Sequence, residues 1–371
     1  MSLYRVLVVG GYGLFGRRLV ERLSRHESLH ITVAGRSDAK GMELVQELRP
    51  TARAELSSGT FDALAPEFTG QLVRLAPDAV VHTSGPFQGQ DYRVAKACIS
   101  AGANYIDLAD GREFVSGITD LDSVAAAAGL LVASGASSVP ALSSAVADHL
   151  ARGMSRVHDI DIGISPGNRT ERGLSTVQAI LSYCGKPLPG TSGASTYGWS
   201  GSRRHGYPEP VGSRLLSPCD VPDLALLPGR YLGNPTVRFG AGLELPFLHL
   251  GMNAMAGMTR MGLVADWSRY ASLLKRAADW FKRFGSDAGA MHVSVTGELT
   301  EGGTATRTWQ LVATEGDGPY VPTLAAAALI RKLMGGEKPP SGARPCVGML
   351  TLEDFTKELV GLNIEMTEPA Q

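Results

Sequence analysis

Three glycines near the start of the chain have the spacing of a nucleotide-phosphate site. Gly11, Gly13 and Gly16 fit G-x-G-x-x-G and directly follow the apolar run at residues 5–9. The first glycine of such a turn permits a tight bend, the second lets the backbone approach a pyrophosphate, and the third lets a helix pack on its strand. The sequence after Gly16 is amphipathic, so a helix N-terminus with unpaired N–H groups should face the phosphates. A purely structural turn is the alternative; we expect a dinucleotide to contact Gly11, Tyr12, Gly13, Leu14, Phe15 and Gly16.

The residue at the end of the second predicted strand distinguishes NADP from NAD. Residues 30–35 form that strand, which ends about 20 residues past the glycines, where NAD sites carry Asp or Glu for the ribose 2′-hydroxyl. This chain has Arg36, whose guanidinium can bind a 2′-phosphate through two hydrogen bonds and stack on adenine. The sequence therefore favours NADP(H) over NAD(H), with Arg36 and Ser37 as contacts. The alternatives are a solvated Arg36 beside a helix cap at Ser37 or Asp38, and competition from Asp38 for the ribose.

A second turn should lie beside the other end of the dinucleotide. Ser84, Gly85, Pro86 and Phe87 follow an apolar strand at residues 79–83. Ligands of parallel sheets lie at the carboxyl ends of the strands, so we expect these four residues beside the nicotinamide ribose. Phe87 is expected to form a wall for the nicotinamide ring; an ordinary core phenylalanine is the alternative.

Three residues are candidates for acid–base catalysis. Asp107 and Asp110 follow the next predicted strand, where a carboxylate can bind a substrate amine or relay a proton. Either carboxylate can instead cap the following helix. Tyr320 opens a helix at the point where the chain should return to the cofactor.

Candidate substrate contacts lie in polar turns further along the chain. One serine follows the last strand of the first domain, and arginines in the later turns are suited to binding a carboxylate. The alternatives are that the serine is a simple turn residue and that the arginines belong to a solvated charge run. The candidates are Ser137, Asn168, Arg169, Arg172, Arg204 and His205.

The composition excludes several classes of protein. The 371 residues include 35 basic and 36 acidic ones, so nothing indicates a nucleic-acid partner. No uninterrupted apolar run reaches about 18 residues, so we expect no integral membrane segment. The four scattered cysteines form no C-x-x-C pair, which predicts no metal site and a cytoplasmic location. The methionine-rich run at residues 252–261 predicts packing in the core or in a homodimer.

The order of apolar patterns predicts an α/β fold with two domains. Short apolar runs alternate with helical runs in the first part of the chain, which indicates β-α-β units and a doubly wound parallel sheet of the Rossmann type. Alternation at residues 291–299 and 305–314 predicts an antiparallel hairpin. We expect a Rossmann domain over residues 1–138, completed by 317–371. Residues 139–316 should form an α/β domain with a mixed or antiparallel sheet for substrate binding or dimerisation.

Five segments carry a family resemblance: residues 8–16, 34–36, 85–90, 105–110 and 135–140. With them the chain resembles the saccharopine dehydrogenase-like family of NADP-binding oxidoreductases. The resemblance implies a Rossmann domain, a second α/β domain and a cleft between them. It also implies hydride transfer to or from a carbon–nitrogen bond.

These observations predict an NADP(H)-dependent oxidoreductase that acts on an imine, amine or carbonyl group of a small, carboxylated metabolite. A non-catalytic NADP-binding sensor or scaffold is one alternative, because the sequence contains no unmistakable acid–base residue. An atypical short-chain dehydrogenase-like reductase is another, which the second domain argues against. Tyr92 and Lys96 form a Y-x-x-x-K, the spacing of the catalytic pair in short-chain dehydrogenases. That pair lies too early in the chain for the catalytic role, so we interpret it as a coincidence.

Overall fold

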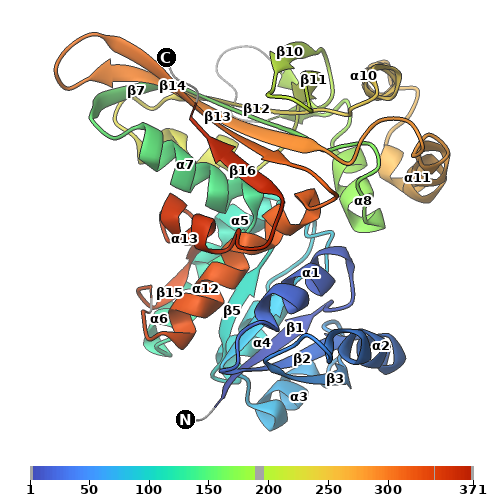
Figure 1. Ribbon diagram of the computed structural model, residues 1–371, viewed down its shortest axis with the longest axis vertical. Helices are drawn as coiled ribbons and strands as arrows, with labels where there is room; N and C mark the ends of the chain where they lie inside the picture. Colours follow the sequence, from blue (N-terminus) through green and yellow to red (C-terminus); the bar gives the residue numbers. More distant parts are fainter. Residues whose placement is uncertain (1–2, 189–195, 338, 369–371) are drawn as a thin grey trace. The chain divides into compact units, whose positions relative to one another are not determined.

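The computed structural model describes residues 3–188, 196–337 and 339–368, and the chain divides into two compact units (Figure 1). The first unit consists of Met1–Leu142 and Pro319–Glu358, and the second of Ser143–Gly318 and Leu359–Gln371. No helix of the described residues has the length and apolar content needed to cross a membrane.

The first unit is built on a seven-stranded sheet in which all strands are parallel. Its strand order is β15-β6-β5-β4-β1-β2-β3. The order reverses beside β1, which pairs with β2 on one side and with β4 on the other. In open α/β sheets this reversal marks the edge where ligands bind. The strands are β1 (Tyr4–Val9), β2 (Leu29–Gly35), β3 (Glu55–Thr60), β4 (Ala79–His82), β5 (Asn104–Asp107), β6 (Leu131–Ser134) and β15 (Gly342–Pro345).

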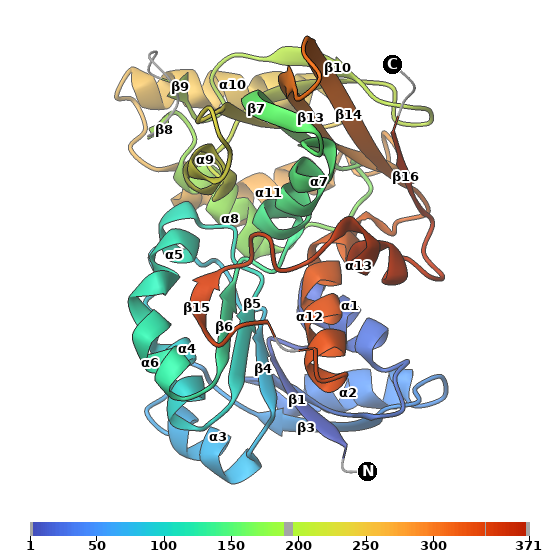
Figure 2. The same cartoon turned by 90° about the vertical axis from the view of Figure 1, so that its left-hand side faces the viewer.

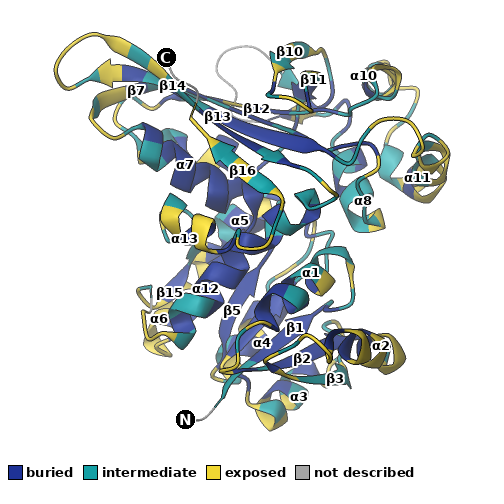
Figure 3. Ribbon diagram, viewed as in Figure 1, coloured by how far each residue is buried: buried dark blue, intermediate teal, exposed yellow. Residues whose placement is uncertain are grey.

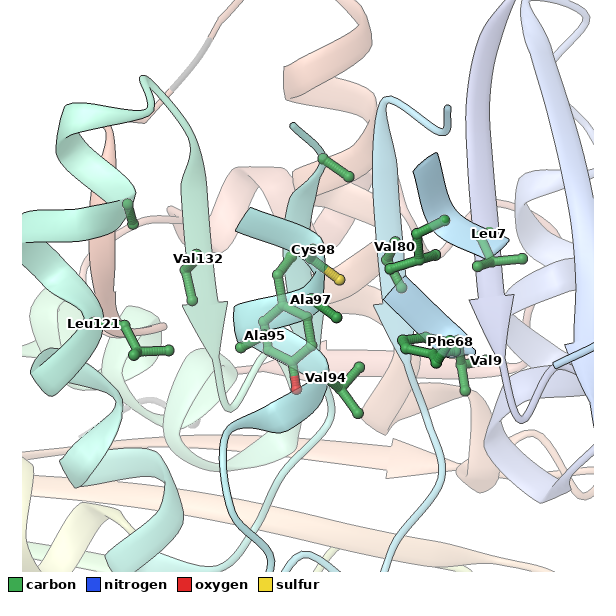
Figure 4. Close-up of a cluster of buried hydrophobic side chains, with 14 of the residues drawn as sticks. Leu7, Val9, Phe68, Val80, Val94, Ala95, Ala97, Cys98, Leu121 and Val132 are labelled. Carbon is green, nitrogen blue, oxygen red and sulfur yellow. The ribbon is translucent and has the colours of Figure 1, made fainter. Parts of the chain in front are cut away.

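Helices cover both faces of this sheet (Figure 2). Both faces are therefore buried, which explains why β1 reads as a continuous apolar run instead of an alternating one. Leu7 and Val9 of β1 pack with Phe68 and Cys98 in the cluster shown in Figure 4. The helices are α1 (Leu14–Leu23), α2 (Asp38–Leu48), α3 (Phe68–Leu75), α4 (Arg93–Ser100), α5 (Arg112–Gly117), α6 (Asp122–Ala127), α12 (Leu324–Met334) and α13 (Leu352–Lys357).

The second unit contains another seven-stranded sheet, in the order β10-β11-β12-β7-β13-β14-β16. The pairing of β7 with β12 is parallel, whereas the other pairings are antiparallel. The strands are β7 (Met154–Ser165), β10 (Arg203–Gly206), β11 (Ser213–Pro218), β12 (Thr236–Ala241), β13 (Gly289–Leu299), β14 (Thr304–Ala313) and β16 (Ile364–Thr367). A short pair is formed by β8 (Pro187–Leu188) and β9 (Thr196–Tyr197). The helices are α7 (Ser143–Leu150), α8 (Leu174–Ser182), α9 (Asp223–Leu226), α10 (Pro246–Arg260) and α11 (Ala271–Asp279).

The two faces of the second sheet differ in polarity. Ile162, Val293 and Trp309 occupy paired positions on β7, β13 and β14 and are buried on the face that α7 contacts. The opposite face carries hydroxyl groups, such as the pair Ser294 and Thr308, whose oxygens lie 2.8 Å apart. This alternation is typical of an antiparallel sheet with one face on the core.

The predicted fold class is confirmed: a Rossmann-like parallel sheet is followed by a second α/β unit with a mixed sheet. The predicted hairpin is β13–β14. One expectation differs from the structure, because residues 317–371 do not stay together. Residues Pro319–Glu358 complete the first unit, whereas β16 pairs with β14 in the second sheet.

A buried carboxylate in the second unit makes its stability dependent on pH. Asp223 is fully buried; its Oδ1 accepts a hydrogen bond from Ser143, and its Oδ2 has no partner among the described residues. Burial raises the pKa of Asp223 to about 7. The folded pKa thus lies above the unfolded value of about 3.9, so the contribution of Asp223 to stability is complete below pH 4 and is lost as the pH rises to 7.

We expect Asp223→Asn to flatten the fall in the free energy of unfolding between pH 4.5 and 7, which for this group amounts to at most about 1.4 kcal/mol per pH unit. Urea titrations followed by circular dichroism across this range measure the slope. Asp120→Asn, at an exposed aspartate, is the matched control. An unchanged slope in the Asp223 variant would show that this carboxylate is already ionised in the folded state.

Candidate active site

The glycine turn between β1 and α1 is fixed to the end of β2 by backbone hydrogen bonds. The N–H groups of Gly10 and Gly11 both donate to the carbonyl oxygen of Ala34, at 2.8 and 3.0 Å. Gly10 has a φ of 82°, a left-handed conformation that favours glycine. The N–H of Gly13 then donates to the oxygen of Gly10 at 2.8 Å, which closes the turn.

The three motif glycines divide into two that are packed and one that is open. A Cβ atom on Gly16 would overlap the carbonyl oxygen of Gly10, and one on Gly11 would lie 2.9 Å from the oxygen of Val8. Gly13 is exposed, and a Cβ atom there would approach only the oxygen of Gly10, at 3.0 Å. Gly13 is also the N-cap of α1 and supplies no side chain to the helix N–H groups. The turn therefore fits a pyrophosphate, because its open glycine and uncapped helix N-terminus lie together.

Tyr12 connects the glycine turn to the start of α2. Its ring lies against Gly35, where a Cβ atom would be 2.5 Å from the ring. Its hydroxyl oxygen accepts a hydrogen bond from the N–H of Ser37 at 2.9 Å. The segment that carries Arg36 is thereby held beside the turn.

Arg36 is exposed and makes no hydrogen bond or ion pair with any described residue. Its neighbours are engaged elsewhere: the Ser37 hydroxyl caps α2 by accepting from the N–H of Lys40, and Asp38 accepts from the hydroxyl of Ser58 at 2.8 Å. The helix cap that the sequence left as an alternative is therefore present at Ser37. The carboxylate of Asp38 is held against β3, and the guanidinium of Arg36 stays available for a ligand.

The turn after β4 lies beside the glycine turn. A Cβ atom on Gly10 would be 2.5 Å from the hydroxyl oxygen of Ser84, and the Gln90 side chain donates to the carbonyl oxygens of Ser84 and Pro86. Ser84, Gly85 and Pro86 are partly exposed at this edge. The predicted turn thus adjoins the predicted phosphate site.

Phe87 does not form a wall for a nicotinamide ring. It is 4% exposed and packs between the rings of His82 and Phe114, with centroid distances of 5.1 and 5.3 Å. The alternative interpretation, a core phenylalanine, describes its position.

Asp107 is fully buried and fixes two strand ends to each other. Its Oδ1 accepts hydrogen bonds from the N–H groups of Ala109 and Gly135 and from the hydroxyl of Ser134, at 2.8 to 3.0 Å. Burial raises the pKa of this carboxyl to about 6. Since no part of Asp107 is exposed, it is placed to hold the ends of β5 and β6 together and not to contact a substrate.

Asp110 remains the candidate acid–base group of this edge. Its Oδ1 accepts a hydrogen bond of 3.1 Å from the Gln88 side chain, so residues that follow β5 and β4 meet here. Asp110 is partly exposed, and burial of its carboxyl raises the pKa. A carboxyl with a raised pKa on a partly exposed residue is suited to proton transfer.

Tyr320 packs along α1. Its hydroxyl donates to the carboxylate of Glu21 at 2.7 Å. The guanidinium of Arg18, which donates to the carbonyl oxygen of Leu14 at 2.7 Å, lies 5.8 Å from the centroid of the Tyr320 ring. The contact of Tyr320 with the cofactor stays a prediction.

Tyr92 and Lys96 do not form a catalytic pair. The hydroxyl of Tyr92 donates to the carbonyl oxygen of Phe114 at 2.8 Å, and its ring packs on the ring of Phe114. Lys96 is exposed on α4. The Y-x-x-x-K spacing thus reflects the packing of α4 on α5.

The predicted substrate contacts mostly have structural partners. Ser137 is 8% exposed in a turn after β6, where its N–H donates to Gly135. Asn168 is buried and donates from its amide to the carbonyl oxygens of Phe281 and Phe284, both at 2.8 Å. These residues are placed to shape their turns.

The two arginines after β7 differ in accessibility. Arg172 is partly buried and donates to the oxygen of Gly167 at 3.4 Å, and burial lowers its pKa. Arg169 is exposed; its guanidinium donates to the carbonyl oxygen of Arg283 at 3.4 Å and its backbone N–H to that of Ser286 at 2.8 Å. Glu244 holds this turn by accepting hydrogen bonds from the N–H of Asn168 at 2.6 Å and from the guanidinium of Arg214 at 3.1 Å. The spacing of these residues in the sequence does not indicate that they are in contact.

His205 belongs to a buried polar cluster on the second sheet, whereas Arg204 is exposed beside it. The His205 ring stacks on that of His292 at 3.6 Å, and burial lowers the pKa of His205 to about 4. His292 in turn contacts the Tyr207 hydroxyl at 2.9 Å and the Asp161 carboxylate at 3.4 Å. Asp161 and His292 were missed from the sequence, although both stand at polar positions of alternating strands. The described residues contain no His, Cys, Asp and Glu group suited to a metal ion.

A parallel sheet with a glycine turn at its reversal point defines the first unit as a Rossmann-type dinucleotide-binding domain. Residues 6–149 match the family model described as Saccharopine dehydrogenase NADP binding domain. The resemblance inferred from the sequence is thereby confirmed.

Two known proteins are similar to this chain, one in sequence and one in structure. A protein named Lipid droplet localized protein from Caenorhabditis elegans is 29% identical over 114 residues, which cover 29% of this chain and 26% of the relative. The match thus spans about a quarter of that relative's length. The structure of apo histidine-tagged saccharopine dehydrogenase (L-Glu forming) from Saccharomyces cerevisiae aligns with 99% of this chain and all of that chain, with a TM-score of 0.67 and 13% identity. This similarity shows a shared fold.

Proposed function

We propose that the protein is an NADP(H)-dependent oxidoreductase that acts on a carbonyl or carbon–nitrogen group of a small, carboxylated metabolite. The observation that carries the cofactor choice is Arg36, an exposed guanidinium without a partner among the described residues, at the end of β2. A guanidinium in this position suits a 2′-phosphate, whereas an NAD site usually offers a carboxylate. The match of residues 6–149 to the model of an NADP-binding domain supports the same choice.

Each part of the site has a defined task in this proposal. The open Gly13 and the N-terminus of α1 bind the pyrophosphate, and Arg36 binds the 2′-phosphate. Ser84, Gly85 and Pro86 border the nicotinamide ribose. When bound, the cofactor supplies or accepts a hydride at its nicotinamide ring.

Asp110 is the residue that we propose for proton transfer. It is the only one of the three predicted acid–base candidates that combines partial exposure with a position at the carboxyl ends of the strands. Its raised pKa lets it hold a proton for the group that is reduced. The exposed Arg169 and Arg204 are the proposed contacts for a substrate carboxylate. We place the enzyme in the reducing cytoplasm, since its four cysteines are unpaired.

A screen of NADPH oxidation tests the proposed reaction. Wild-type protein is incubated with 2-oxo acids, alone and together with amino acids, and the absorbance of NADPH is followed. We expect turnover with at least one member of the panel. Asp110→Asn should then lower kcat by about 10² to 10³-fold and leave NADPH affinity unchanged, because general acid–base catalysis contributes about this factor. The exposed Asp120→Asn is the matched control, and full activity of Asp110→Asn would exclude the proposed role.

A non-catalytic NADP-binding sensor is the second candidate. The engagement of Asp107 and Tyr320 in structural hydrogen bonds favours it, because two of the three acid–base candidates are not available to a substrate. NADPH binding without turnover of any compound in the screen would support the sensor over the enzyme.

A further inference from the structure

Two helices of the second unit expose a concentrated set of large apolar side chains. Of fifteen such side chains that the described residues expose, eight lie between residues 246 and 284. Their exposed fractions run from 48% for Phe284 to 80% for Trp280. We call this surface the α10–α11 face; it comprises Phe247, Leu250, Met261, Leu263, Tyr270, Leu273, Trp280 and Phe284. Figure 3 shows the exposed positions along both helices.

Exposed apolar side chains occur on α11 and at both of its ends. Leu273 lies within α11, Tyr270 ends the preceding 3-10 turn, and Trp280 and Phe284 follow the last helical residue. Ala271, at the start of the helix, is 1% exposed and packs inward. The large apolar side chains of this segment therefore face solvent, contrary to the usual arrangement in a globular protein.

Aromatic contacts join the start of α10 to the segment that follows α11. Phe247, at the start of α10, packs edge-on against Phe281 with a centroid distance of 5.0 Å. Phe281 in turn lies 6.5 Å from Phe284. The exposed Phe247 and Phe284 thus belong to one aromatic cluster, and contiguous exposed apolar patches mark interaction sites.

Three exposed arginines stand in and beside α11. Arg276 lies within the helix, Arg269 lies in the preceding 3-10 turn, and Arg283 follows the helix. The guanidinium of Arg283 lies over the ring of Phe284, 4.9 Å from its centroid. Residues 246–284 contain six Lys and Arg against two Asp, a net charge of +4, whereas the whole chain has −1.

The charge distribution decides between two occupants of this surface. In a symmetric contact with a second copy the same patch faces itself, so the net positive charge of residues 246–284 in one copy would face that of the other. Like charges at such a contact cost several kcal/mol. An anionic lipid surface instead offers phosphates to the arginines and an apolar layer to the aromatic side chains, whose amphipathic rings favour the interface.

We propose that the α10–α11 face docks on the surface of anionic lipid membranes, with its exposed apolar side chains in the interfacial layer and Arg269, Arg276 and Arg283 on the lipid phosphates. Such a contact is peripheral and reversible, because it uses only surface side chains of α10, α11 and the turns beside them.

Flotation with vesicles of stated composition tests the proposal. Full-length protein is mixed with vesicles of phosphatidylcholine containing 30% phosphatidylglycerol and with vesicles of phosphatidylcholine alone. We expect at least tenfold tighter binding to the anionic vesicles. Replacing Arg269, Arg276 and Arg283 together by glutamine should weaken this binding about 100-fold, since each basic residue contributes about 1 kcal/mol near an anionic surface. The double variant Leu273→Ser, Trp280→Ser should also reduce binding at least tenfold.

Matched controls come from exposed residues outside the surface. Leu232→Ser replaces a side chain that is 81% exposed in the same unit, and Arg53→Gln removes an exposed arginine of the first unit; neither should change binding. Thermal unfolding and analytical ultracentrifugation are run on every variant. Absent binding, or equal binding by the face variants and the controls, would overturn the proposal. Dissociation of a dimer by the Leu273, Trp280 variant would assign the surface to a second copy instead.

Discussion

Arg36→Ala is expected to weaken NADPH binding about 10- to 100-fold while NADH binding changes by less than about twofold. The reason is that the two dinucleotides differ only in the 2′-phosphate, and a charge-assisted hydrogen-bonded contact to a phosphate contributes about 1.5–3 kcal/mol. The structure leaves the Arg36 side chain without a partner among the described residues, so its removal should disturb no contact of the fold. Fluorescence titration of the wild type and the variant with both dinucleotides measures the two dissociation constants.

Lys40→Ala is the matched control for charge in the same segment. Lys40 is exposed four residues after Arg36 and contributes only its backbone N–H to the cap of α2. The Lys40→Ala substitution should weaken NADPH binding by no more than about threefold, because an exposed charge beyond contact distance is screened by salt. Unchanged NADPH binding in Arg36→Ala would refute the 2′-phosphate contact. Equal losses of NADPH and NADH would show that the arginine supports the shape of the site instead.

Features of the site that depend on local spacing were predictable from the sequence. The glycine turn, the second strand and Arg36 lie within 30 residues, and their roles follow from backbone sterics and helix polarity. The fold class followed from alternating apolar runs, because a parallel sheet buried on both faces leaves that pattern. These are the parts for which neighbouring residues determine the structure.

Features that depend on distant partners were not predictable. The sequence places Asp107 at a strand end, but its buried carboxylate is held by hydrogen bonds that it accepts from Ser134 and Gly135, 27 and 28 residues away. Tyr320 is paired with Glu21 across 299 residues. The direction of a side chain at a strand end depends on which donors the neighbouring strand presents, and a single sequence does not reveal this. The same limit applies to β16, whose partner β14 is specified only by the register of the assembled sheet.

Substitutions at two glycines of the turn should affect folding and ligand binding differently. Gly16→Ala is expected to lower the free energy of unfolding by about 3 kcal/mol and to abolish measurable NADPH binding, because its Cβ atom would overlap Gly10 and lie 2.7 Å from the Thr83 hydroxyl oxygen. Gly13→Ala should change the free energy of unfolding by less than about 1 kcal/mol, since its φ of −75° suits alanine and the nearest atom is 3.0 Å away. It should nevertheless weaken NADPH binding at least about tenfold, because a methyl group would occupy the place where the pyrophosphate approaches the backbone.

Urea unfolding and NADPH titration are measured for the wild type, Gly16→Ala and Gly13→Ala, with Gly70→Ala as the control. Gly70 is exposed in α3, where a Cβ atom meets nothing closer than 3.5 Å, so alanine there should leave binding unchanged and stabilise the helix by up to about 1 kcal/mol. Wild-type stability of Gly16→Ala would contradict the close contact of α1 with the turn. If Gly13→Ala binds NADPH as tightly as the wild type, the phosphates bind elsewhere. The fold tolerates a methyl group at this position, so only a ligand that touches Gly13 should respond to it.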